Sequence, residues 1–176
     1  MKKLVLLLAA ALLLAGFAGC AKAETWETVD DEIPLEAESC LDSAYRIVFA
    51  VPDGAAEETF AASDGCAVYT QANGDYEITS QVLLSSSMES AVRRLSGFEP
   101  ERLSIIETTR CGMPEYQFAW YAAGDEGGRL CRADILMDGL YCYALTFSVR
   151  EGLGTAYDST IRDVFASLSL ESRDEV

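Results

Sequence analysis

The chain has 176 residues, and its 29 acidic residues outnumber its 13 basic residues, which gives a net charge of −16. Nucleic-acid binding needs clustered Lys and Arg to neutralise phosphates, so this composition argues against a nucleic-acid partner. The sequence contains no histidine, which excludes Ser-His-Asp and Cys-His catalysis and His-ligated zinc.

The first 20 residues have the pattern of a secretory signal. Lys2 and Lys3 supply positive charge, and the apolar run 4–15 follows them. This run is too short to cross a bilayer, which takes about 20 residues. Residues 17–20, with the sequence Phe-Ala-Gly-Cys, resemble the lipobox of bacterial lipoproteins, although Phe17 stands where that pattern usually has Leu.

The resemblance implies that residues 1–19 are removed and that Cys20, now the first residue, receives a diacylglyceryl group. Stable anchoring takes two lipid signals, and the two acyl chains of this group supply both. The expected location is the extracytoplasmic face of the cell membrane, or the outer membrane in a host that has one, since Ala21 is not the Asp that retains lipoproteins at the inner membrane. The alternative is a plain secreted protein in which Cys20 is incidental.

Loss of Lys2 and Lys3 would change the net charge from −16 to −18. Anionic lipid headgroups repel such a surface, so we expect the domain to stand off the membrane. Residues 20–39 are interpreted as the lipidated N-terminus and an acidic tether, in which Trp26 and Val29 could instead dock on the domain as a short edge segment. Residues 40–170 are interpreted as a single domain, and 171–176 as a charged, frayed tail.

The first half of the domain alternates strand signals with turn signals. Strands are predicted over 45–51, 66–70 and 76–83, the last two joined by an Asn73-Gly74 hairpin turn. A helix is predicted from Met88, with Ser87 as its N-cap and Gly97 as its left-handed end. Its apolar residues recur at i, i+3, i+4 and i+7 and would face the sheet: Met88, Ala91, Val92 and Leu95.

The second half predicts strands over 103–108, 116–121, 129–136 and 141–149, then a helix with an apolar stripe between 157 and 168. Thr155 and Asp158 suggest a capping box at its start. For the last hairpin we expect a three-residue loop, 137–139, that places Ala133 opposite Tyr143. A two-residue loop would place Tyr143 on the same face as Asp134.

These elements predict an α+β fold, a largely antiparallel sheet of about six to seven strands with two helices packed on it. In the order of its elements the chain resembles the PsbP/Mog1-type fold over residues 41–170. The resemblance rests on no residue motif and implies no functional residues.

Five cysteines remain after Cys20: Cys40, Cys66, Cys111, Cys131 and Cys142. They have no C-x-x-C spacing and are interpreted as small core residues with one disulfide or none; Cys131 and Cys142 are not expected to bond. The aspartates beside glycines are interpreted as turn residues rather than a calcium site, so no metal and no cofactor is expected: Asp53, Asp64, Asp75 and Asp138.

We therefore expect a non-enzymatic binding or accessory module, held at the membrane through Cys20, with a protein or small-molecule partner. Its ligand cleft could be lined by aromatic residues, although such stripes more often form cores: Tyr116, Phe118, Trp120, Tyr121, Tyr141, Tyr143, Phe147 and Tyr157. One alternative is a thiol or carboxylate enzyme, in which Cys111 beside Arg110, or Cys131 beside Arg132, would have a lowered pKa. The other alternative is a structural envelope protein.

Overall fold

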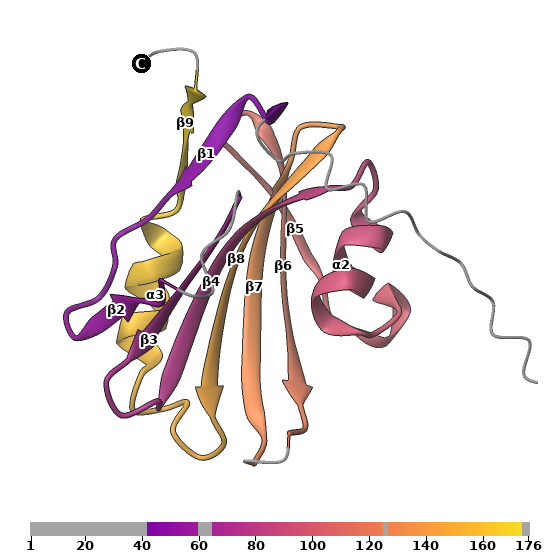
Figure 1. Cartoon of the computed structure of the whole chain (residues 1–176). Helices are drawn as coiled ribbons and strands as arrows, with labels where there is room; N and C mark the ends of the chain where they lie inside the picture. Colours follow the sequence, from indigo (N-terminus) through magenta and orange to yellow (C-terminus); the bar gives the residue numbers. More distant parts are fainter. Residues whose placement is uncertain (1–41, 60–64, 125–126, 174–176) are drawn as a thin grey trace, which may run out of the picture. The chain divides into compact units, whose positions relative to one another are not determined.

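In the computed structural model, residues 42–59, 65–124 and 127–173 are described. They form an antiparallel sheet of seven strands in the order β2-β3-β4-β8-β7-β6-β5 (Figure 1). The strands are β2 (Ala55–Glu57), β3 (Cys66–Gln71), β4 (Tyr76–Leu84), β5 (Ile106–Arg110), β6 (Met113–Ala122), β7 (Arg129–Met137) and β8 (Tyr141–Arg150). A second sheet pairs β1 (Tyr45–Val48) with β9 (Ser169–Ser172).

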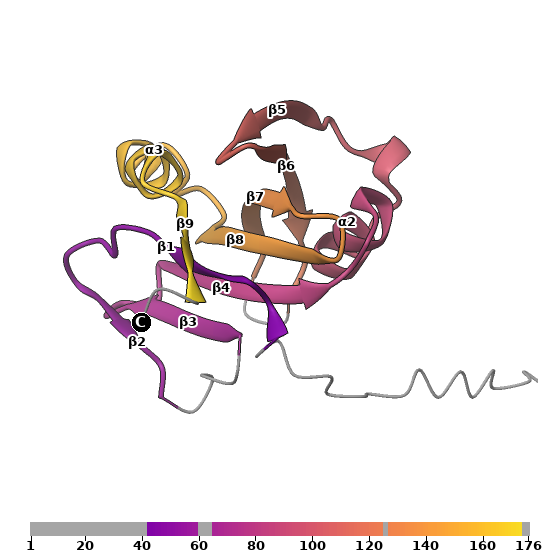
Figure 2. The ribbon, with the colours of Figure 1, turned by 90° about the horizontal axis from the view of Figure 1, so that it is seen from above.

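The main sheet is covered on both faces (Figure 2). Helix α2 (Met88–Ser96) packs on one face, where its Ala91 and Val92 are fully buried. Helix α3 (Asp158–Ala166) packs with β1 and β9 on the other face, where its Ile161 and Val164 are buried. The predicted α+β class, with two helices on an antiparallel sheet, is confirmed.

The two faces of the sheet carry separate hydrophobic cores. The core under α3 is built from large side chains, among them Tyr143, Phe147, Leu136 and Ile78. The core under α2 is built from smaller residues together with Phe118 and Trp120. Because both faces are covered, the central strands β7 and β8 are buried along most of their length, which explains their continuous apolar sequences.

The first helix is capped as predicted. The Ser87 hydroxyl accepts a hydrogen bond from the Ser90 N–H at 3.2 Å, and Gly97 ends the helix at a φ of 75°. The capping box predicted at the second helix is wrong: α3 begins at Asp158 and has no side-chain cap. The Asp158 carboxylate lies instead near two guanidinium groups, 3.4 Å from Arg132 and 3.7 Å from Arg162.

The predicted register of the β7–β8 hairpin is also wrong. Leu136, not Ala133, lies opposite Tyr143, and the turning residues are Gly139, at a φ of 98°, and Leu140. The Asp138 carboxylate fixes this turn because it accepts hydrogen bonds from the N–H groups of Leu140, at 2.9 Å, and Tyr141, at 2.7 Å. As a result, Asp134 and Tyr143 do share a face.

Several boundaries differ from those predicted. Strand β2 is not among the predicted strands, β1 ends at Val48, and β5 begins at Ile106, after a 3-10 helix over residues 100–102. Residues 171 and 172, predicted as tail, belong to β9, where Glu171 is ion-paired with Arg46 at 2.5 Å.

The signal segment, Cys20, Cys40 and the tether 20–39 lie outside the described residues, and so does the end of the tail, 174–176. In the described part of the chain, no helix has both the length and the hydrophobicity that a membrane crossing requires.

Candidate functional site

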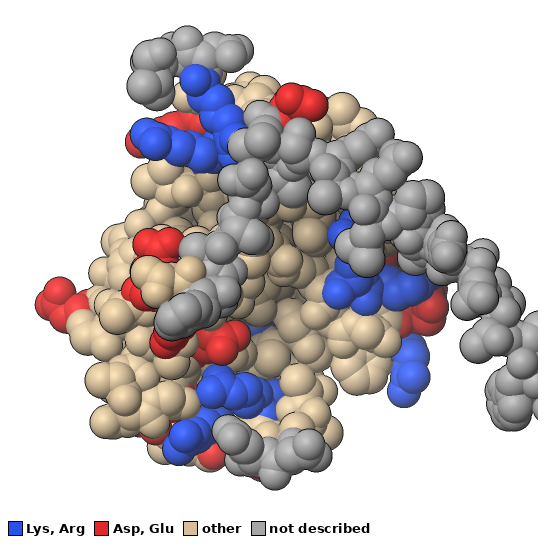
Figure 3. Space-filling view, in the orientation of Figure 1, with Lys and Arg blue, Asp and Glu red and all other residues tan. Residues whose placement is uncertain are grey.

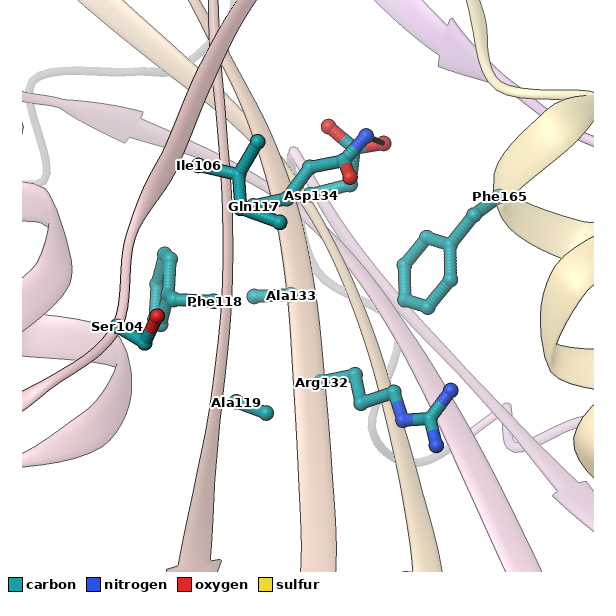
Figure 4. Close-up of a pocket in the computed structure, with 9 residues that line it drawn as sticks. All are labelled: Ser104, Ile106, Gln117, Phe118, Ala119, Arg132, Ala133, Asp134 and Phe165. Atoms are coloured by element: carbon teal, nitrogen blue, oxygen red, sulfur yellow. Dashed lines mark hydrogen bonds between the residues drawn. The ribbon is translucent and has the colours of Figure 1, made fainter. Parts of the chain in front are cut away.

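A pocket of about 260 Å³ lies between α3 and the strands β5, β6 and β7 (Figure 4). We call it the α3 pocket, and it is lined by Ser104, Ile106, Gln117, Phe118, Ala119, Arg132, Ala133, Asp134 and Phe165. The walls are partly apolar, because they include the exposed side chain of Ile106 and the ring of Phe165, which projects from α3. Asp134 and Gln117 lie together at one end, and Arg132 lies at the other.

Strand pairing brings the polar residues to this face. Gln117 of β6 is opposite Asp134 of β7, and Glu115 is opposite Leu136, whose side chain belongs to the core under α3. Because side chains alternate along a strand, Glu115, Gln117 and Asp134 all point to the α3 side of the sheet. Arg110 of β5 is paired with Met113 and joins them from the neighbouring strand.

Five side chains form what we call the Arg110 cluster: Thr108, Arg110, Glu115, Gln117 and Asp134. The Arg110 guanidinium lies 2.6 Å from Glu115 Oε1 and 3.4 Å from Asp134 Oδ2. It also donates hydrogen bonds to the backbone carbonyls of Phe165, at 2.6 Å, and Leu168, at 3.1 Å. The Thr108 hydroxyl donates to Glu115 Oε2. The cluster thus connects β5, β6 and β7 to the chain at the C-terminal end of α3.

The two carboxyl groups of the cluster have opposite pKa shifts. Burial, followed by the charge of Glu115, raises the pKa of Asp134 to about 7. Burial acts to raise the pKa of Glu115 as well, but hydrogen bonds from Thr108 and Asp134 and the charge of Arg110 outweigh it, so that pKa is lowered. At pH 7 Asp134 is therefore about half protonated, whereas Glu115 is ionised.

One acceptor of this cluster is unused. Asp134 is 1% exposed, and its Oδ1 atom has no hydrogen-bond partner. Its Oδ2 atom accepts a hydrogen bond from Gln117 Nε2 at 3.3 Å. A buried polar atom without a partner costs free energy, so an unpaired oxygen at the edge of a pocket is a position at which a ligand can donate a hydrogen bond. In the described part of the chain, this cluster included, no three Cys, Asp or Glu residues come close enough to hold a metal ion.

The predicted thiol sites do not have the geometry of a reactive cysteine. Cys131 and Cys142 are buried free thiols in the core under α2. Burial raises the pKa of Cys131 and raises that of Cys142 to about 12, the opposite of the lowering expected for Cys131 beside Arg132. Cys111 is exposed at a φ of 53°, but the guanidinium of Arg110 is already bound by Glu115 and by α3.

The aromatic residues do not form the cleft that their number suggested. Phe118 and Trp120 stack in the core under α2, and Tyr143 and Phe147 lie in the core under α3. Only Phe118 of the predicted set lines the α3 pocket.

Asp138 acts as a turn residue, as predicted. Its burial acts to raise its pKa, but hydrogen bonds from Tyr141, Leu140 and Tyr143 lower it.

Sequence reasoning missed Glu115, Gln117 and Asp134 as site residues. Aspartate is unfavourable inside a strand, and Asp134 stands within the apolar run Ala-Asp-Ile-Leu of β7. That position was the available signal, because an acidic residue in a strand buried on both faces needs a partner or a function.

No protein-family model matches the sequence, and no curated protein is significantly similar to it. A crystal structure from Bacteroides thetaiotaomicron is similar in fold, with a TM-score of 0.49 and 12% identity over 76% of this chain. The match covers 51% of that protein, so this chain spans about half its length.

Two other solved structures are of the types expected from the order of the elements. The cyanobacterial PsbP (CyanoP) of Synechocystis has a TM-score of 0.49 and 13% identity, over 78% of this chain and 99% of its own. The Ran-binding protein Mog1p of Saccharomyces cerevisiae has a TM-score of 0.47 and 12% identity, over 74% and 92%. These similarities concern the fold alone.

The substitution Asp134→Asn tests the buried carboxyl group through stability. The pKa of Asp134 is about 7 in the folded state, against 3.8 for the unperturbed group, so its ionisation opposes folding and the wild type loses stability as pH rises through this window. The uncharged amide avoids this loss. The unfolding free energy of the variant minus that of the wild type should therefore increase by on the order of 2 kcal/mol as pH is raised from 5 to 8, as measured by urea denaturation. Asp53→Asn, at an exposed loop position, is the control. A pH-independent difference would contradict the assignment.

Alkylation of the native protein should separate the thiols by burial. Cys111 is exposed and should react with iodoacetamide, whereas Cys131 and Cys142 should react only after unfolding, because they are buried and their pKa values are raised. Peptide mass spectrometry identifies the labelled residue. Rapid labelling of Cys131 in the folded protein would revive the thiol-enzyme alternative.

Proposed function

We propose that this protein is a lipid-anchored, extracytoplasmic binding module that holds a small ligand in the α3 pocket and does not act as an enzyme. The observation that carries the proposal is the combination found in that pocket. Ile106, Ala119 and Phe165 provide apolar contact surface, while Asp134 provides a buried oxygen that lacks a partner. Ligand sites typically combine apolar walls with a few fixed polar groups.

The anchoring part of the proposal rests on sequence. Lys2 and Lys3, the apolar run 4–15 and Cys20 have the order and spacing of a lipoprotein signal. The lipid chains would account for membrane attachment of a chain whose described part offers no membrane-crossing helix.

The charge distribution favours a small-molecule or protein partner over nucleic acid. On the face shown in Figure 3, the Lys and Arg side chains form small groups separated by uncharged residues and by Asp and Glu. Nucleic-acid binding needs a continuous basic surface, and the chain as a whole carries a net charge of −16.

One observation supports a carboxylate enzyme as a second candidate. Paired carboxyl groups with opposite pKa shifts, as in Glu115 and Asp134, can divide the roles of general base and general acid. However, Glu115 is 4% exposed, is held by Arg110 and Thr108, and does not line the pocket. Because only one member of the pair reaches the pocket, binding is favoured over catalysis. Recovery of a chemically altered compound after incubation would favour the enzyme.

Substitution of the lipidation residue tests the location. The variant Cys20→Ser cannot form the thioether, so it should be found in the soluble extracytoplasmic fraction or remain as the uncut precursor, whereas the wild type should sediment with membranes. Fractionation and intact-mass measurement distinguish these states. An unmodified Cys20 in the membrane-bound wild type would contradict the proposed anchor.

Filling the pocket tests the binding role. Ala119 is an exposed residue of the pocket wall, so Ala119→Trp should occupy the cavity without disturbing either core. Each protein is purified from its own cells and denatured, and the small molecules that it releases are measured. The amount released per protein should be at least about tenfold lower for the variant, which corresponds to about 1.4 kcal/mol in binding free energy. Ala56→Trp, at an exposed position of β2, is the matched control. Equal amounts in both variants, or no compound from the wild type, would contradict the proposal.

A further inference from the structure

We propose that the ligand of the α3 pocket carries a small alkylammonium group, which binds between Asp134 and Gln117. This inference rests on the proposed function and names the chemical class that the pocket selects.

When Asp134 is ionised, the cluster contains more negative than positive charge. Glu115 and Asp134 face a single guanidinium, that of Arg110. That guanidinium lies closer to Glu115, at 2.6 Å, than to Asp134, at 3.4 Å, and it also donates to two carbonyls of the chain around the end of α3. An ionised Asp134 therefore lacks a full counter-charge, which a cationic ligand would supply.

The hydrogen bonds around Asp134 leave room for a better donor. Its Oδ1 atom has no partner, and its Oδ2 atom is held by Gln117 Nε2 at 3.3 Å. The same Nε2 atom donates to Glu115 Oε1, also at 3.3 Å. Both distances are at the long end for such bonds, so the Gln117 amide can move at little cost. An ammonium group could then donate to Asp134 Oδ1 and to the amide oxygen of Gln117.

The remainder of the pocket fits a short alkyl chain. Phe165, Ala119 and Ile106, which is 58% exposed, border the space next to Asp134 (Figure 4). Arg132 lies two residues away on β7, roughly 7 Å along the strand, and its guanidinium is 3.4 Å from Asp158. Its charge is thereby partly neutralised and directed toward the start of α3.

Binding of an alkylammonium ion should depend on pH through Asp134, whose pKa is about 7. The charged groups that surround it are Arg110 of β5, Glu115 of β6 and Arg132 of its own strand, whereas β8 places Leu145 opposite it and α3 presents Phe165 to the pocket. An alkylammonium ion remains protonated below pH 10, so Asp134 is the group that titrates between pH 5 and pH 8. Affinity should rise over that interval as the carboxyl group ionises.

The test is a titration of the full-length, ¹⁵N-labelled protein with n-butylammonium chloride and, separately, with 1-butanol, an uncharged probe of similar size. Potassium chloride keeps the ionic strength equal. At pH 8, n-butylammonium should shift the side-chain amide resonances of Gln117 and the backbone resonances of Ala119 and Ala133. Its affinity should fall at least about tenfold at pH 5 and in Asp134→Asn, but not in the exposed control Asp53→Asn.

Each other outcome overturns the inference. Equal affinities for n-butylammonium and 1-butanol, or an affinity unchanged in Asp134→Asn, would show that the pocket binds small molecules without selecting a cation, and the proposed function would stand. If neither probe shifts these resonances, the alkylammonium inference fails, and the ligand recovery from Ala119→Trp decides separately whether the pocket is a binding site.

Discussion

The guanidinium of Arg110 holds together the part of the molecule that contains the pocket. It is bound to a carboxylate of β6, lies near a carboxyl group of β7 and donates to the backbone around the C-terminal end of α3. A positive charge at this position also suits the negative end of a helix dipole. Arg110 therefore links the chain at the C-terminal end of α3 to β5 and β6.

This arrangement explains why a pocket lies on one side of α3. Over the central strands, large side chains such as Phe147 and Leu145 fill the space beneath the helix. Toward β6 and β5 the same face carries Ala119, Gln117 and Thr108, which are smaller or polar, so the layer of packed side chains ends there. The pocket is therefore the place where the apolar core gives way to a buried polar cluster, and the buried, unpaired Oδ1 atom of Asp134 belongs to that cluster.

Much of the fold could be predicted from local patterns, because each depends on neighbouring residues. The cap at Ser87, the end at Gly97 and the alternation of Phe118 with Gln117 are such cases. The register of the β7–β8 hairpin is different, because a register that keeps Tyr143 away from Asp134 follows only if a core face excludes a carboxyl group. The Asp134 carboxyl group is accommodated on that face because Arg110 and Gln117 contact it. Both residues lie on other strands, so local sequence spacing could not place them. The site was missed for the same reason.

The pairing of β1 with β9 joins the two ends of the described part of the chain, with Tyr45 opposite Ser172. Nearly all the described residues lie between these partners, so their closure has a larger loop entropy to overcome than that of any other strand pair among the described residues. The hairpins of the main sheet connect near neighbours and have no such barrier. During folding, the small sheet should therefore close after the seven-stranded sheet and α3 have brought its two strands together.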